Sequence, residues 1–80
     1  MKIHYSAKFN GHPEGHHGCF EVAIKKEQIE ENKDQIISLA IGSCRDKCKW
    51  IFGMDFETMD FFEVFYYDCT EVLIFKKQKS

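Results

Sequence analysis

The feature that most constrains the fold of this chain is a C-terminal segment that is apolar on both sides. Residues 61–68 are rich in aromatic and β-branched side chains, which favour a strand, and a strand sends successive side chains to opposite faces. One face would hold Phe62, Val64 and Tyr66. The other would hold Phe61, Phe65 and Tyr67. A strand of this kind normally lies in a sheet that is covered on both sides.

Residues 72–77 repeat the pattern, because Val72 and Ile74 alternate with Leu73 and Phe75. Turn-forming residues at 68–71 separate the two apolar segments. We therefore expect residues 61–68 and 72–77 to form a hairpin that closes the chain.

Two further strands are expected near the N-terminus. Residues 3–9 and 19–24 each alternate apolar with more polar side chains, which predicts an antiparallel pair. The segment between them, residues 10–18, contains three glycines, the only proline and three of the four histidines. This composition predicts a long irregular loop.

Helical spacing replaces the period of two between Lys26 and Cys48. The apolar stripe of this segment consists of Ile29, Ile36, Ile37, Ala40, Ile41, Cys44 and Cys48. Residues 32–34 are able to delay the start of the helix, and Gly42 with Ser43 are able to end it early. Residues 50–56 then predict another strand and residues 57–60 a turn, with a short helix capped by Asp55 as the alternative.

The expected fold class is α+β. A small, mostly antiparallel sheet of four to five strands would carry one amphipathic helix on one face, in the order ββαβββ. With 80 residues, the chain is expected to be a single domain, residues 1–80.

One helix covers only one face of a sheet, so the second apolar face needs another cover. The protein's own loops, a second copy of the chain or a different protein would supply it, or the sheet would curl into a small barrel. The interface hypothesis names six contact residues: Phe61, Glu63, Phe65, Tyr67, Leu73 and Phe75. If the sheet is turned over, the outward set becomes Phe62, Val64 and Tyr66.

Charge is distributed unevenly along the chain. The formal net charge is −2, from 11 basic and 13 acidic residues, which does not favour direct nucleic-acid binding. Residues 50–75 contain no Lys or Arg. Their acidic residues are Asp55, Glu57, Asp60, Glu63, Asp68 and Glu71. An aromatic face with a negative rim would be attracted to a basic groove of another protein, such as a groove that receives nucleic acid.

These features predict a small, non-enzymatic protein-binding module. By analogy it resembles the stoichiometric inhibitors or antagonists that phages and mobile elements direct at a host defence or nucleic-acid-handling protein. Self-association into a homodimer through the same face is also expected to be possible. No apolar run approaches the roughly 18 residues of a membrane span and no signal peptide is apparent, so we expect a cytoplasmic protein with free thiols.

Two alternatives involve the histidines and cysteines. A zinc-binding regulatory domain would use His16, His17, Cys19, Cys44 and Cys48, although their spacing matches no zinc signature closely. A small Cys/His enzyme would use Cys19 as nucleophile with His16 or His17 as base. No other cofactor or catalytic residue is expected, because no phosphate-binding, dinucleotide-binding or nucleophile-elbow motif is present.

Overall fold

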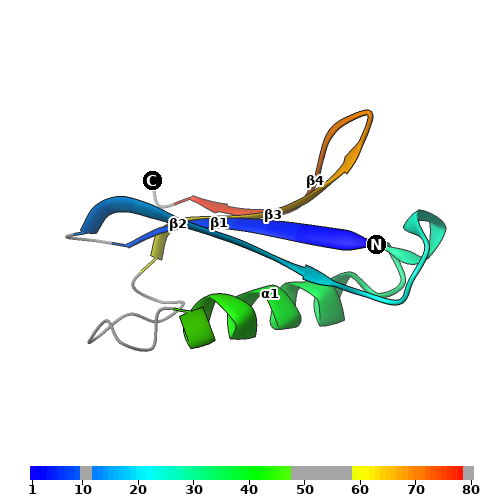
Figure 1. The fold of residues 1–80 in the computed structure, drawn as a ribbon, viewed down its shortest axis with the longest axis horizontal. Coiled ribbons are helices and arrows are strands. Elements are labelled where there is room, and N and C mark those ends of the chain that lie inside the picture. The colour runs from blue at the N-terminus through cyan, green and yellow to red at the C-terminus, as the bar shows by residue number, and fades with distance from the viewer. Residues whose placement is uncertain (10–11, 48–58, 79–80) are drawn as a thin grey trace.

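The fold is a four-stranded antiparallel sheet with one helix packed against one of its faces, as the expected α+β class requires (Figure 1). The computed structural model describes residues 1–9, 12–47 and 59–78, with side chains in the second strand from residue 15 onward. The elements are β1 (Lys2–Phe9), β2 (His12–Glu21), the 3-10 helix η1 (Lys26–Gln28), α1 (Lys33–Lys47), β3 (Met59–Asp68) and β4 (Thr70–Gln78). Within these residues the order is ββαββ, close to the expected ββαβββ.

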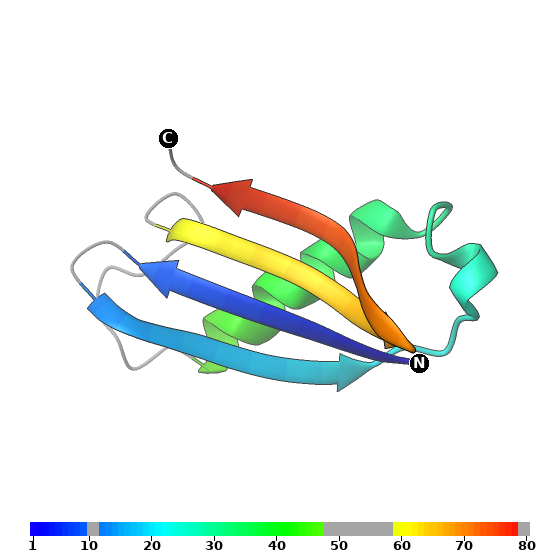
Figure 2. The same ribbon diagram turned by 90° about the horizontal axis from the view of Figure 1, so that it is seen from above.

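The strands lie in the order β2-β1-β3-β4, and each neighbouring pair is antiparallel (Figure 2). Strands β2 and β3 therefore run in the same direction on the two sides of β1. Helix α1 lies on the connection between them and under one face of the sheet. None of the described helices has the length and apolarity of a membrane span.

The prediction of a loop at residues 10–18 is wrong from residue 12 onward, where the structure has a strand. Strand β2 begins at His12, and its pairing with β1 extends from Phe9 opposite His12 to Lys2 opposite Glu21. Main-chain pairing with β1 outweighs the glycine-rich composition of the segment. Proline is compatible with this position because β2 is an edge strand, where one missing N–H need not break a ladder.

Strand β2 also ends earlier than expected, at Glu21 and not at residue 24. The helical segment starts with η1 and continues as α1 only from Lys33, in agreement with the delay predicted at residues 32–34. Gly42 and Ser43 do not end the helix, which continues to Lys47. The strand expected at residues 50–56 and the alternative helix capped by Asp55 lie outside the described residues.

The core lies between α1 and the sheet. Helix α1 contributes Ile36, Ala40 and Cys44, which are at most 1% exposed. Opposite them are buried side chains of the sheet, namely Ile3, Tyr5, Ala7, Phe9, Met59, Phe62, Val64 and Ile74. The buried side chains predicted from the alternation of β1 and from the helical stripe thus pack together in one cluster.

The closing hairpin is confirmed and is longer than expected. Strand β3 begins at Met59, inside the expected turn at residues 57–60, and β4 ends at Gln78. The strands join at Cys69, which has a positive φ of 66°. A register shift lies between the pairs Val64 with Phe75 and Phe65 with Leu73, so β4 carries one extra residue at this point.

Candidate protein-binding face of the sheet

The face of the sheet turned away from α1 is not covered by any described helix or strand (Figure 2). We call it the open face. Its side chains from β1 and β3 follow from the register, which places His4 opposite Phe65, Ser6 opposite Glu63 and Lys8 opposite Phe61. Residues paired across antiparallel strands point to the same side of a sheet.

Three rings form a compact cluster on the open face. His4 is stacked on Phe65, with ring centroids 5.5 Å apart and an interplanar angle of 13°. Tyr67 lies edge-on to both, at 5.1 Å from His4 and 5.7 Å from Phe65. Offset-stacked and edge-to-face arrangements of this kind are favourable for aromatic pairs. The cluster therefore presents a pre-ordered aromatic surface.

Exposure within this surface differs sharply from residue to residue. Phe65 is only 9% exposed and does not belong to the core cluster between α1 and the sheet. Its ring is therefore enclosed by its neighbours on the open face. Tyr67 is 60% exposed and Leu73, which pairs with Phe65, is 51% exposed. Phe65 thus anchors the surface, and Tyr67 with Leu73 are its accessible part.

Electrically, the open face is balanced. Register places Lys76 opposite Glu63 and Glu71 opposite Tyr67, and the Lys76 ammonium lies 5.7 Å from the Phe61 ring centroid. Among the described residues that the register pairs on this face, the other charged side chains are Lys2, Lys8 and Glu21. Three lysines therefore accompany three glutamates, so the lysines of β1 and β4 offset the negative rim that the C-terminal half of the sequence suggests.

The structure brings five of the six predicted contact residues together. Phe61, Glu63, Phe65 and Tyr67 lie on the open face of β3, and Leu73 lies beside them on β4. Phe75 lies on the helix-covered face, where its ring centroid is 6.3 Å from that of Phe62 and it packs against the core. The extra residue in β4 separates Leu73 from Phe75, which strict alternation would have placed on one face.

The predicted zinc ligands do not converge. His17 and Cys19 lie on the open face, opposite Ser6 and His4, whereas Cys44 belongs to α1 and is buried between that helix and the other face of the sheet. His16 points to the side of Phe9, whose ring centroid is 5.8 Å from its own. Among the described residues no group of three His, Cys, Asp or Glu side chains is arranged to hold a metal ion. Cys48 lies outside the described residues.

The arrangement around Cys19 also offers little for nucleophilic catalysis. His16 is on the opposite face of β2 from Cys19, since adjacent strand residues point to opposite sides. His17 shares the face of Cys19, but its Nδ1 lies 3.1 Å from the Ser6 hydroxyl oxygen. Neither histidine is thus positioned in contact with the thiol.

Two features of the surface were not identified from the sequence. His4 belongs to the open-face cluster, and the signal for it was its place on the polar side of the alternating segment 3–9. Leu39 is 46% exposed on α1, outside the predicted stripe, and lines a groove described below. In the sequence, the indication of this groove was a leucine that lies outside the apolar stripe of the helix.

Comparison with protein-family models, with curated proteins and with solved structures found no match for this chain. Its function is therefore argued from its own geometry.

Proposed function

We propose that this protein is a non-enzymatic protein-binding module whose contact surface is the open face of the sheet. The observation that carries this proposal is the exposed aromatic and aliphatic surface of Tyr67 and Leu73, anchored by the enclosed ring of Phe65. Neighbouring apolar side chains exposed on one face of a folded protein are a feature of binding sites. Aromatic side chains at the centre of an interface frequently dominate its binding energy.

The dimensions of the molecule support a specific protein contact. Its principal extents are 37 × 24 × 19 Å, and the sheet spans the longest and the shortest of these directions, with the helix stacked on it along the middle one (Figures 1 and 2). A face of that size is comparable with the roughly 800 Å² that each partner contributes to a standard interface. Stoichiometric inhibition or antagonism of another protein is one function that a rigid face of this kind performs without catalysis.

The charges on the open face indicate which kind of partner surface is complementary to it. Because the register-paired residues described on this face include three lysines and three glutamates, a partner with an apolar patch and mixed charges fits better than a strongly basic groove. A nucleic-acid-handling or host-defence protein would be bound through such a patch and not through its nucleic-acid groove.

A photo-crosslinking experiment tests this proposal. A benzophenone amino acid replaces Tyr67 in one sample and Asp46, which is exposed near the C-terminal end of α1, in the matched control. We expect illumination in extracts of the source cells to give an adduct of defined mass from position 67 and none from position 46. Adducts from both positions alike, or from neither, would contradict the proposal.

Two substitutions separate binding from folding. Tyr67→Ser and Leu73→Ser alter side chains that are more than half exposed, so we expect a nearly unchanged melting temperature and loss of the crosslinked partner. Sedimentation velocity of the unmodified protein shows whether the partner is a second copy. A concentration-dependent dimer that both substitutions abolish would identify the homodimer as the complex that uses this face.

A further inference from the structure

The outer edge of β2 presents unpaired main-chain groups. The Val22 amide donates to the Met1 carbonyl at 2.9 Å, and the Met1 amino group donates to the Val22 carbonyl at 2.8 Å, so these two residues form a hydrogen-bonded pair. Alternation along an antiparallel ladder then turns the N–H and C=O groups of Glu21, Cys19 and His17 away from β1. Within the described part of the chain, no hydrogen bond reaches the outward groups of Glu21 and Cys19.

The two edges of the sheet are protected to different extents. Strand β4 contains the extra residue near Ile74 and carries Lys76 and Lys77, and both bulges and lysines discourage strand addition. On β2, the Lys47 ammonium donates to the outward carbonyl of His17 and so occupies that position. The edge beyond it, at Cys19 and Glu21, lacks an equivalent guard among the described residues.

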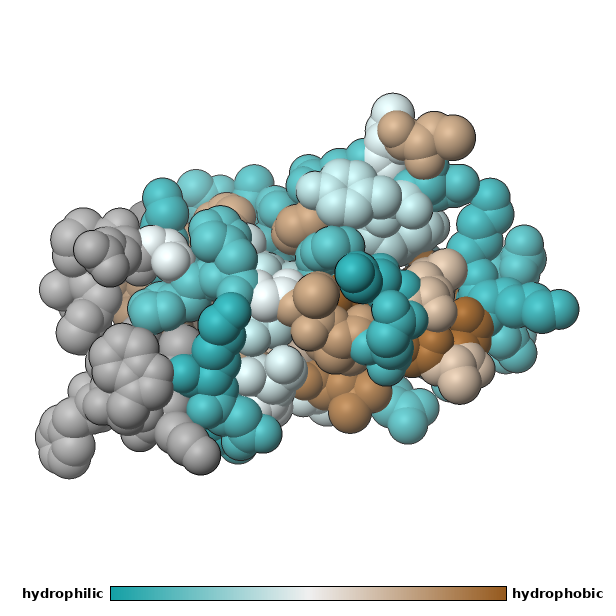
Figure 3. All heavy atoms as spheres, viewed as in Figure 1, coloured by the Kyte–Doolittle hydropathy of each residue, from teal (hydrophilic) through white to brown (hydrophobic). Residues whose placement is uncertain are grey.

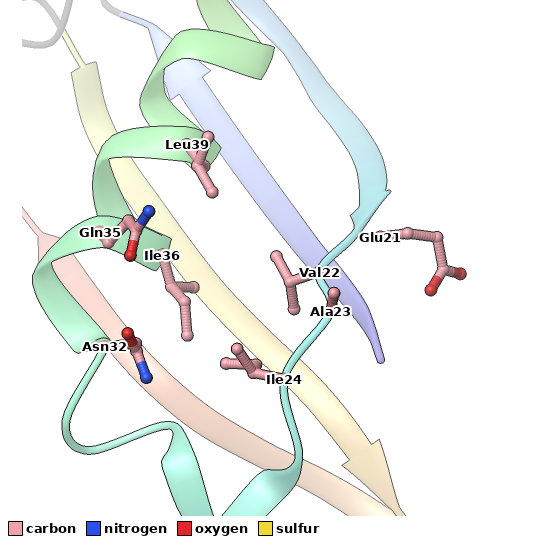
Figure 4. Close-up of a pocket in the computed structure, with 8 residues that line it drawn as sticks. All are labelled: Glu21, Val22, Ala23, Ile24, Asn32, Gln35, Ile36 and Leu39. Carbon is pink, nitrogen blue, oxygen red and sulfur yellow. The ribbon is translucent and has the colours of Figure 1, made fainter.

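An apolar groove adjoins this part of the edge (Figure 4). It has a volume of about 310 Å³, and its lining consists of Glu21, Val22, Ala23, Ile24, Asn32, Gln35, Ile36 and Leu39. In the space-filling view, apolar side chains gather where the end of β2 meets α1 (Figure 3). The volume is at the lower limit of the roughly 300–1,000 Å³ typical of ligand pockets, which suits one or two side chains.

The pleat of a strand added at this edge would divide its side chains between two environments. Alternate side chains would point to the helix side, next to Val22, Ile24 and Leu39. The others would point to the side of Glu21, whose carboxylate is directed away from the apolar residues (Figure 4). An aliphatic residue followed by a basic residue satisfies both environments.

The charges around the groove favour a basic segment. The Glu21 side chain is 70% exposed, and although one carboxylate oxygen is 3.5 Å from the Met1 amino nitrogen, it remains open to a second cation. Residues 27–34, which lead into α1 at the groove, hold four acidic side chains against Lys33, a net charge of −3. Complementary charge of this kind selects partners and speeds encounter.

We propose that the edge of β2 at Cys19 and Glu21, together with this groove, binds an extended peptide segment of another protein by strand addition. Main-chain hydrogen bonds to the two edge residues hold the segment, and the groove receives one bulky aliphatic side chain. An adjacent Lys or Arg of the segment lies beside Glu21. The groove is separate from the Tyr67 and Leu73 surface, because it lies between β2 and the helix that covers the other side of the sheet. Glu21 is the open-face residue that borders the groove.

Selection from a library of short random peptides displayed on phage tests the proposal. We expect enriched peptides to share an aliphatic residue next to Lys or Arg. When an enriched peptide is synthesised and added, the amides of Cys19 and Glu21 should become protected from hydrogen exchange. Methylation of the peptide nitrogens that face β2 should abolish binding, because their N–H groups donate the main-chain hydrogen bonds. Methylation of the alternate nitrogens, which face away from β2, should leave binding intact.

Matched variants locate the site. Leu39→Asp places a charge in the groove lining, and we expect it to weaken peptide binding by about tenfold or more. Ser38→Asp places the same charge one residue away on exposed helix surface outside the lining, and it should bind as the unmodified protein does. Both positions are exposed, so both variants should fold.

Three results would overturn the proposal. One is the absence of any enriched peptide, and another is equal binding by the Leu39→Asp and Ser38→Asp variants. The third is a dimer of the chain itself that Leu39→Asp dissociates, which would make a second copy the occupant. Tyr67→Ser should leave peptide binding intact, so failure here is distinguishable from failure of the open-face proposal.

Discussion

Individual residues of this protein are constrained by what lies directly across the sheet. Gly18 is the clearest case, because it pairs with Tyr5 and a side chain at position 18 would overlap the Tyr5 ring. The tyrosine ring in effect fills the space above the glycine. The glycine at this position is thus required by packing and not by a turn.

We predict that Gly18→Ala lowers the free energy of unfolding by about 1–3 kcal/mol, the usual cost of overpacking a well-filled site. Gly42→Ala is the matched control, since an added Cβ there meets no atom within 4 Å and lies inside α1. That change should stabilise the protein by about 0.5–1 kcal/mol through helix propensity. Urea denaturation of the two variants would measure both effects, and equal responses would contradict this explanation.

Cys69 is constrained by its backbone conformation. It joins β3 to β4 with a φ of 66°, a left-handed conformation that costs a non-glycine residue about 1–2 kcal/mol. Cys69→Gly should therefore raise the free energy of unfolding, by about 1 kcal/mol. Cys69→Val should lower it, because a β-branched residue tolerates positive φ poorly. Thermal melts that move in the same direction for both variants would contradict the assignment.

Secondary-structure elements are connected by a small number of specific contacts. The η1 segment is held to the β3–β4 turn by Lys26, whose ammonium donates to the Asp68 carboxylate at 2.8 Å. The hydrogen bond to Asp68, and then the Coulombic attraction of the same carboxylate, raise the pKa of Lys26 above its ordinary value of 10.5. Folding therefore favours the protonated lysine.

The sign of this shift sets the pH dependence of the pair. A raised pKa in the folded state means that the stabilisation is complete below 10.5 and disappears as the pH rises through the higher folded pKa. We expect Lys26→Met to lower the melting temperature slightly at neutral pH, with the difference vanishing at strongly alkaline pH. Lys33→Met is the control, since Lys33 forms no ion pair within the described ranges. A difference that persists unchanged at high pH would rule out the ion pair as its cause.

Prediction at the level of elements succeeded where the pattern was local. Alternation in residues 3–9 and the apolar stripe of Ile36, Ala40 and Cys44 correspond to β1 and α1, because each pattern is imposed by the period of one element. The prediction for residues 12–18 was wrong, because their glycines and proline indicate a loop and only pairing with β1 makes them a strand. Phe75 was assigned to the wrong face because the extra residue in β4 interrupts alternation.

At the scale of the molecule, the decisive property is a sheet with one helix layer on one face and, within residues 1–9, 12–47 and 59–78, no helix or strand on the other. The sheet also separates the cysteine and histidine residues, with His17 and Cys19 on one side and Cys44 on the other. His17 and Cys19 therefore cannot join Cys44 around one zinc ion without unfolding the sheet.

We accordingly predict that a chelator leaves the melting temperature of the purified protein unchanged and that elemental analysis finds less than one equivalent of zinc. A structural zinc site would instead lose its folding free energy on chelation. Cys44→Ala provides the control for packing, because it removes a buried thiol whatever the metal content. One bound equivalent with a melting temperature that falls on chelation would restore the zinc alternative.

The amino-acid sequence by itself determined the α+β class and the apolar faces of β1, α1 and β3. Those properties follow from periodicity, which each short segment carries alone. The tertiary structure decided which strand forms the edge, where β4 changes face, and that a groove opens between β2 and α1. These depend on pairing between residues far apart in the chain, and no local pattern specifies such pairing.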